Sequence, residues 1–482
     1  MTDAGFLAPF MFLSLLLLLL SGYPVAFILG AVGLMFGLIG VYLDVIPMVL
    51  VQAVPERLFG IMRNDTLLAI PFFTFMGLVL ERSGMAEQLL ESMSRLLARV
   101  RGGLAFAVIV VGALLAATTG VVAASVMAMG LISLPIMLRQ GYSPALSSGV
   151  IMASGTLAQI VPPSLVLIVL ADTLGTPVGD MYVGAMLPSM ILIGLFAAFI
   201  ASVAWFKPEL LPKQANPPPI EWPPLLMGLV PPLVLIFLVL GTIFIGLATP
   251  TEAGAMGAVG ALLLALVRRC LTRQRLQEAL SKTARLTCFV LFILIGSSLF
   301  SLVFRALGGD LWVEHLFGNL PGGALGFLLV VNTLIFILGC FLDFFEIVFI
   351  VVPLLVPMIH QFGLSPIWFG VILAMNLQSS FLTPPFGFSL FYLKSVAPPE
   401  VQTRDLYRGV VPFIMIQLIT VVLIVCVPSV VLTSTPDQDP VDIAPAALTL
   451  QGTTQSDAIR LMMQIAQEFE SPPSSPVQRA TP

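Results

Sequence analysis

Long apolar segments follow one another along the chain from Phe6 to Leu432. A helix needs about 20 apolar residues to cross the hydrocarbon core of a bilayer, and segments of about this length recur throughout this region. Only 10% of the 482 residues are charged and 58% are hydrophobic, so a soluble fold could not cover its apolar surface. The apolar runs are continuous, whereas a β-barrel needs alternation. The sequence therefore predicts an all-α polytopic membrane protein.

Charge, cysteine and histidine patterns exclude several other classes. Six acids and two bases follow Ser434 and account for the whole net charge of −4, so no basic face for nucleic acid is expected. The four cysteines lie far apart and form no CxxC pair, so the sequence predicts neither a disulfide framework nor a zinc site. Neither an HExxH, a Walker A nor a GxSxG motif occurs, so we expect no enzyme and no catalytic residue.

The chain divides into a membrane domain and a tail. We expect a transmembrane permease domain over 1–433 and a polar, mostly disordered tail over 434–482. The first base is Arg57, so the basic start of a signal peptide is missing and the first apolar run is expected to remain as a membrane helix. Residues 85–101 and 272–286 have the pattern of amphipathic helices lying in the interface, with ordinary loop helices as the alternative.

Basic residues predict the orientation. The stretch from 268 to 285 carries six bases and one acid, whereas 81 to 101 carries four bases and three acids. Because cytoplasmic loops are enriched in Lys and Arg, the 268–285 stretch is the stronger cytoplasmic candidate.

An internal repeat is the most specific feature of the sequence. Six residues recur at a constant offset of 222 positions: Pro135, Gly141, Ser143, Pro144, Pro162 and Pro163 match Pro357, Gly363, Ser365, Pro366, Pro384 and Pro385. A proline pair breaks a helix in mid-span. We therefore expect inverted repeats with two re-entrant helical hairpins, over about 143–172 and 365–393, with proline-kinked ordinary spans as the alternative.

Polar residues gather where these segments break. Hydroxyl and amide groups are costly in lipid and must find partners, and their oxygens suit a hard cation such as sodium. Broken helices near the membrane centre also present N-termini that attract anionic substrate groups. Asp343 lies at the end of an apolar run and is a candidate for cation binding or gating, with a carboxylate at a loop end as the alternative.

Five stretches taken together resemble the large membrane subunit of TRAP transporters. They are IPFFTFMGLVLERSG (70–84), ASGTLAQIVPPS (153–164), ATPTEAGAMGA (248–258), GCFLDFFEIVFIVVPLLVP (339–357) and NLQSSFLTPPFG (376–387). The resemblance covers about 1–433. It implies a tripartite, binding-protein-dependent secondary transporter of the bacterial inner membrane that imports an organic acid by sodium symport. It also implies an elevator mechanism, in which the hairpin-bearing domain moves against a scaffold.

The same resemblance implies partners and a substrate class. A periplasmic substrate-binding protein would deliver the acid, and a small four-helix membrane subunit would accompany this chain. The amphipathic helices would serve as arms on opposite faces. The motifs LAQIVPPS and FLTPPFGF resemble those of the family branch associated with 2-oxo and aromatic acids. A stand-alone ion-coupled organic-anion carrier with two hairpins is the alternative.

Site residues follow from the resemblance, position by position. Cation binding is expected at Thr118, Thr119, Ser154, Gly155, Thr156, Gly339, Asp343, Asn376 and Thr383. Substrate binding is expected at Pro162, Pro163, Ser164, Pro384 and Pro385. Sodium is the only metal ion implied, and no cofactor is expected. Many family members have a Ser-Gly-Ser element where this chain has Thr118-Thr119-Gly120-Val121, which leaves the first cation site less defined.

Overall fold

The computed structural model describes residues 6–19, 21–213, 222–318, 320–384 and 386–432, so the tail over 434–482 lies outside the described residues. Within these ranges the regular elements are α-helices with short 3₁₀ turns, and there are no strands. Seven of the described helices are long and apolar enough to cross a membrane, or ten if each bent pair counts as one span. The prediction of an all-α polytopic protein is confirmed.

The helices of the two halves follow the same order. The first half comprises α1 (Leu7–Leu19), α2 (Val25–Tyr42), α3 (Met48–Gln52), α4 (Val54–Met62), α5 (Asp65–Arg82), α6 (Met85–Leu97), α7 (Gly103–Thr119), α8 (Val122–Arg139), α9 (Pro144–Thr156), η2 (Leu157–Gln159), α10 (Leu165–Leu174), α11 (Val178–Phe206) and η3 (Pro208–Leu210). The second comprises α12 (Trp222–Phe244), α13 (Pro250–Val267), α14 (Arg273–Ala306), α15 (Gly309–Gly318), α16 (Gly323–Leu338), α17 (Phe344–Ile350), α18 (Val352–Gln361), α19 (Pro366–Leu382), α20 (Phe388–Val396), α21 (Thr403–Cys426) and α22 (Ser429–Leu432). At the offset of 222, α7 to α11 match α16 to α21.

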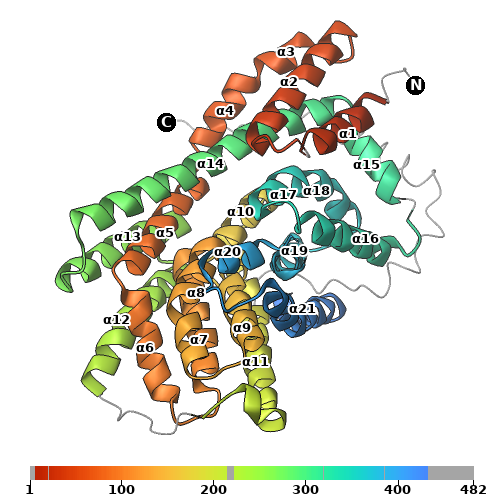
Figure 1. Ribbon diagram of the computed structural model, residues 1–482. Helices are drawn as coiled ribbons and strands as arrows, with labels where there is room; N and C mark the ends of the chain where they lie inside the picture. The colour runs from red at the N-terminus through yellow and green to blue at the C-terminus, as the bar shows by residue number, and fades with distance from the viewer. Residues whose placement is uncertain (1–5, 20, 214–221, 319, 385, 433–482) are drawn as a thin grey trace, which may run out of the picture.

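Four helices, α2, α5, α13 and α14, form a framework that we call the scaffold. The pairs α2–α14 and α5–α13 pack along their lengths, and α14 also packs on α5. Figure 1 shows α14 running diagonally along both partners. Gly33 and Gly37 of α2 face Leu299 and Val303 of α14 at distances that leave little room for a side chain. Small residues of this kind let membrane helices approach closely.

Helices α7 to α11 and α16 to α21 form a second body that we call the bundle. Helix α9 packs against α7, α8 and α21, and α19 packs against α10, α16 and α21. The two repeats also exchange contacts, because α20 lies on α8 while α10 lies on α17 and α18. The bundle is therefore one interlocked unit built from both repeats.

The breaks in the bundle differ from the predicted hairpins. Helices α7 and α8 pack against each other across a link of two residues, Gly120 and Val121, so the first helical hairpin lies here. In contrast, α9 and α10 have different neighbours, and α10 lies beyond the end of α9, toward α17 (Figure 1). Segment 143–172 is thus two half-helices around a break, and 365–393 likewise splits into α19 and α20. Proline interrupts a helix, but chain reversal needs a turn residue such as Gly120, whose φ is 58°.

The two amphipathic segments lie at the same end of the molecule, not on opposite faces. Residues 272–286 are the start of the 34-residue helix α14, which contains no proline and no glycine before Gly296. The Arg268 guanidinium donates to Gln88 Oε1 at 2.6 Å, and Arg82 pairs with Glu278 at 3.1 Å. The reason is the repeat itself, because the counterpart of 85–101 at the offset of 222 is α15 and not 272–286.

Candidate functional site

The breaks of the two repeats meet at the centre of the bundle. Gln378 Nε2 of α19 donates to Thr156 Oγ1 of α9 at 3.4 Å, and these two residues are separated by 222 positions. A residue can touch its own repeat counterpart only beside the axis that relates the two copies. The pseudo-two-fold axis of the molecule therefore passes through this contact.

The hydroxyl of Thr156 joins three helices. It donates to Ala153 O at 2.9 Å, and it accepts from Gln378 Nε2 and from Gln417 Nε2 of α21, each at 3.4 Å. A hydroxyl has one proton and two lone pairs, so its capacity is fully used. Sequence reasoning included Thr156 as a cation ligand but missed Gln417, although an amide within the apolar run of α21 was a signal.

Buried polar atoms without partners lie on both glutamines that contact Thr156 and on the nearby Gln159. Gln378 Oε1, Gln417 Oε1 and both polar atoms of Gln159 have no hydrogen-bond partner among the described residues. All three glutamine side chains are fully buried. Most buried polar atoms in proteins are paired, so unpaired amide oxygens mark a place where a cation or water could bind.

The candidates of the first repeat lie against the α7–α8 hairpin. Ser154 is buried and donates to Val150 O at 2.6 Å. A Cβ at Gly155 would clash with Val126 of α8, so only glycine fits there. A Cβ at Gly120 would come within 2.9 Å of Leu165 Cγ, which places the α7–α8 link against the start of α10. The side chains of Thr118 and Thr119 lie outside the described part of the structure.

The candidates of the second repeat lie between α16 and α19. Asn376 Nδ2 donates to Asn332 O at 2.7 Å and to Asn332 Oδ1 at 3.0 Å. Gly339 lies directly against Ser380, with no room for a Cβ. Thr383 Oγ1 donates to Ser379 O at 2.9 Å. Asn332 was missed from the sequence, although a costly amide in an apolar run was the available signal.

Asp343 begins a helix. Its side chain accepts from Phe344 N at 2.9 Å, and Glu346 Oε2 accepts from Asp343 N at 3.1 Å. The pair forms a capping box at the N-terminus of α17, which satisfies backbone groups that the helix leaves unpaired. This geometry supports the structural alternative for Asp343, a carboxylate at the end of a loop.

The substrate candidates differ in exposure and bonding. Pro162, Pro163 and Ser164 are buried. Ser164 caps α10, because its hydroxyl accepts from Val166 N at 3.2 Å and donates to Gln159 O at 2.8 Å. Pro384 is half-buried, and Pro385 lies outside the described residues. Ser164 therefore stabilises the break, which leaves its hydroxyl less available to a ligand.

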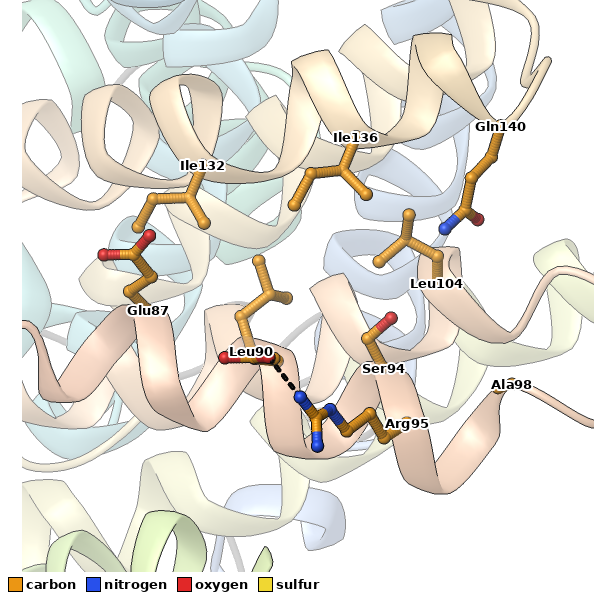
Figure 2. Close-up of a pocket in the computed structure, with 10 residues that line it drawn as sticks. Glu87, Leu90, Ser94, Arg95, Ala98, Leu104, Ile132, Ile136 and Gln140 are labelled. Atoms are coloured by element: carbon orange, nitrogen blue, oxygen red, sulfur yellow. Dashed lines mark hydrogen bonds and ion pairs between the residues drawn. The ribbon is translucent and has the colours of Figure 1, made fainter. Parts of the chain in front are cut away.

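Two of the cavities among the described residues lie between the bundle and the helices beside it. The first, of about 410 Å³, separates α6 from α8; Figure 2 shows Glu87 and Leu90 of α6 facing Ile132 of α8 across it. The Arg95 side chain lines this cavity, and its guanidinium is already paired with the Glu91 carboxylate, with 2.6 Å between nitrogen and oxygen. The second, of about 390 Å³, lies between α5 and α14 of the scaffold and α8 of the bundle, and we call it the interface cavity.

The family model and the similar proteins of known name point to the same transporter family. Residues 12–430 match the family described as the DctM component of tripartite ATP-independent periplasmic transporters. The C4-dicarboxylate TRAP transporter large permease protein DctM of Pseudomonas aeruginosa is 31% identical, over 79% of this chain and 88% of that protein. The sialic acid TRAP transporter large permease protein SiaM of Vibrio cholerae is 27% identical, over 85% of this chain and 94% of that protein.

A solved structure shares the fold. The Alcanivorax borkumensis YdaH transporter superposes with a TM-score of 0.56 at 16% sequence identity, over 81% of this chain and 90% of that chain. At this identity the likeness concerns the fold alone. An arrangement of helices like that found here is therefore known in another transporter.

Proposed function

The chain belongs to the DctM component family of tripartite ATP-independent periplasmic transporters, and on that premise we propose that it imports an organic acid by sodium symport. It acts as the large membrane subunit of a three-part system in the bacterial inner membrane. A small four-helix membrane subunit and a periplasmic substrate-binding protein complete that system. The observation that carries the proposal is the meeting of the two repeats at Thr156 and Gln378, among unpaired buried oxygens.

Sodium binding is assigned to the helix breaks. Carbonyl and hydroxyl oxygens suit a hard cation, and both breaks expose such groups inside the bundle. One site would involve Ser154 and Gly155 with the α7–α8 link and the backbone carbonyl of Thr156, because the hydroxyl of Thr156 is already fully hydrogen-bonded. The other would involve Asn376, Thr383 and Gly339. The capping role of Asp343 makes its carboxylate the least favoured of the candidate ligands.

Movement of the bundle against the scaffold is the proposed transport step. The bundle holds both breaks and is interlocked by contacts between the repeats, which favours motion as a rigid unit. The scaffold helices are held to one another by close glycine contacts. An elevator displacement of this kind would carry the central site from one membrane face to the other.

The substrate is proposed as a small carboxylate. The relative in Pseudomonas aeruginosa is named for C4-dicarboxylates, and one in Escherichia coli, 27% identical, is named for 2,3-diketo-L-gulonate. The sequence resemblance to the 2-oxo and aromatic acid branch adds two further candidates. All of these substrates carry a carboxylate that a helix N-terminus would attract.

Uptake into proteoliposomes tests the proposal. The chain would be reconstituted with its small subunit, and labelled succinate, malate and 2-oxoglutarate would be offered with an inward sodium gradient, with and without the binding protein. Uptake that needs both sodium and the binding protein supports the three-part symporter. Uptake without the binding protein would favour the stand-alone carrier, and uptake that ignores sodium would contradict symport.

A further inference from the structure

The interface cavity combines an apolar wall with polar groups from the scaffold. Val121, Ala124 and Met127 of the α7–α8 hairpin line one side. Thr74, Glu81 and Lys282 line the other. Its volume of about 390 Å³ falls in the range of small-molecule sites, which are mostly apolar with a few placed polar groups.

Three of the polar atoms at this cavity have no partner. They are Thr74 Oγ1, Glu81 Oε2 and Arg82 Nε, each without a hydrogen bond among the described residues. Thr74 is only 2% exposed, so its hydroxyl cannot turn to bulk solvent. Leaving buried polar atoms unpaired is costly, so the arrangement favours a ligand that supplies the missing bonds.

The unpaired groups define the ligand they would accept. Arg82 Nε and the Lys282 ammonium only donate, the Thr74 hydroxyl donates or accepts, and an ionised Glu81 only accepts. Donors from Arg82 and Lys282 match the oxygens of a carboxylate. The acceptor on Glu81 matches a hydroxyl proton, whereas it would oppose the oxygen of a keto group. The set therefore fits a hydroxy acid.

The cavity lies at the basic end of the molecule. Four bases between Arg82 and Arg101 and six between Arg268 and Arg285 gather at this end, where Arg82 meets Glu278. Helices α5 and α14 run from here toward the other end, where Arg63 and Arg305 lie. By the positive-inside rule the basic end faces the cytoplasm.

A hydrogen bond joins scaffold and bundle at the opposite end of the same interface. There Asn64 Nδ2, at the start of α5, donates to Asp172 Oδ1 of α10 at 2.7 Å. The repeat counterparts of these residues are Leu286 and Lys394. Leu286 has no polar side chain and lines the cavity, and Lys394 donates instead to Val401 O at 3.0 Å. The bond that joins scaffold and bundle at one end is thus replaced by the cavity at the other.

We propose that the interface cavity is a cytoplasm-facing binding site for a hydroxy acid, in which Arg82 and Lys282 hold the carboxylate and Glu81 accepts from the hydroxyl. This inference rests on the proposed transport function and names the substrate class and the residues of a site that the helix breaks do not include. The acid would occupy this site on its way out of the bundle. Thr74 would donate to the second carboxylate oxygen.

Cysteine protection in inside-out membrane vesicles tests the site. In a background with the four native cysteines replaced by serine, Ala124→Cys introduces a thiol in the cavity wall, and its labelling by a maleimide is timed. The ligands are matched sets: lactate, propionate and pyruvate, then malate, succinate and oxaloacetate. We expect each hydroxy acid to slow labelling about tenfold more than its deoxy or keto partner, because a group left unpaired weakens binding.

Variants separate the roles of the three side chains. Lys282→Gln should abolish protection by all acids, while Arg285→Gln, an exposed neighbour on the same helix, should leave it unchanged. Glu81→Leu should make lactate and propionate equal. Ala128→Cys repeats the measurement from a second position, in case Ala124→Cys disturbs the wall.

Several outcomes would overturn the inference. Equal protection by all members of a set, stronger protection by pyruvate than by lactate, or no labelling at either position would each contradict it. Sodium-driven uptake is measured separately, in proteoliposomes that contain the same cysteine variants. Normal uptake without protection therefore contradicts the cavity site and leaves the proposed transport function intact. Protection without uptake supports the cavity site and contradicts the proposed transport function.

Discussion

The two repeats share one arrangement of helices but differ in chemistry where those helices break. In the first repeat, the hairpin link is Gly120 and Val121, and α8 begins without a side-chain cap. In the second, the corresponding helix α17 begins with the capping box of Asp343 and Glu346. At the centre, the short hydroxyl of Thr156 faces the longer amide of Gln378, its own counterpart.

This difference teaches that the repeat preserves backbone shape and leaves side chains free to specialise. Two unlike residues at a symmetry axis can form one hydrogen bond, whereas two identical hydroxyls of this size would not span the same gap. The acids of the second link likewise stabilise a helix start that the first repeat builds with a glycine turn. Each of the following changes tests one side of this comparison.

The largest effect is expected at the axis. Thr156→Val removes the acceptor of two buried amides, Gln378 Nε2 and Gln417 Nε2, and each unpaired group costs about 1–3 kcal/mol. The free energy of unfolding in detergent should fall by that amount or more. Thr173→Val is the matched control, because Thr173 Oγ1 donates only to Val169 O of its own helix. Equal losses in both variants would show that the axis contact carries no special weight.

The break of the second repeat should affect sodium activation. Asn376→Ala removes the contact with Asn332, and Thr383→Ala removes a hydroxyl at the break. Losing one ligand worth about 1.4 kcal/mol raises the sodium concentration for half-maximal uptake about tenfold. Thr283→Ala serves as control, since the buried Thr283 makes the same type of bond, to Ala279 O, in the scaffold helix α14. Wild-type sodium dependence in both variants would remove them from the site.

The Asp343 side chain should stabilise the fold through its capping hydrogen bond rather than through its charge. Asp343→Ala should lower the free energy of unfolding by about 1 kcal/mol, the usual cost of losing an N-cap. Asp343→Asn should unfold like the wild type, because asparagine caps a helix equally well. Sodium-driven uptake is then compared between the two. A strongly raised sodium requirement in Asp343→Asn, at unchanged stability, would restore Asp343 as a cation ligand.

The smallest effect is expected where scaffold and bundle touch. Asp172→Ala removes the acceptor of Asn64 but keeps the cap that Asn64 provides to Thr66 N. A partly exposed bond of this kind contributes about 1 kcal/mol or less. Thermal unfolding should barely change, while labelling of Ala124→Cys should slow as the hydrogen-bonded end loosens and the interface cavity is less often open. Unchanged labelling would mean that the bond does not hold the two bodies in this arrangement.

Several parts of the fold could be predicted because they depend on local chemistry. Apolar runs dictate helices in a bilayer, and the proline pairs dictate breaks, wherever the rest of the chain lies. The constant offset also placed Thr156 and Asn376 at matching breaks. The reversal at Gly120 was missed because a single glycine does not by itself distinguish a hairpin from a kink. Asn332 was missed because its partner is 44 positions away.

The sequence alone determined that this chain is a helical membrane protein with two copies of a broken-helix unit. Only the tertiary structure decided which helices turn back, that both amphipathic segments share one end, and that Thr156 meets Gln378 and Gln417, whose amide oxygens have no partner among the described residues. The physical reason is range. Hydrophobic length and proline geometry act within one helix, whereas partners of buried polar groups are chosen by packing between helices far apart in the chain.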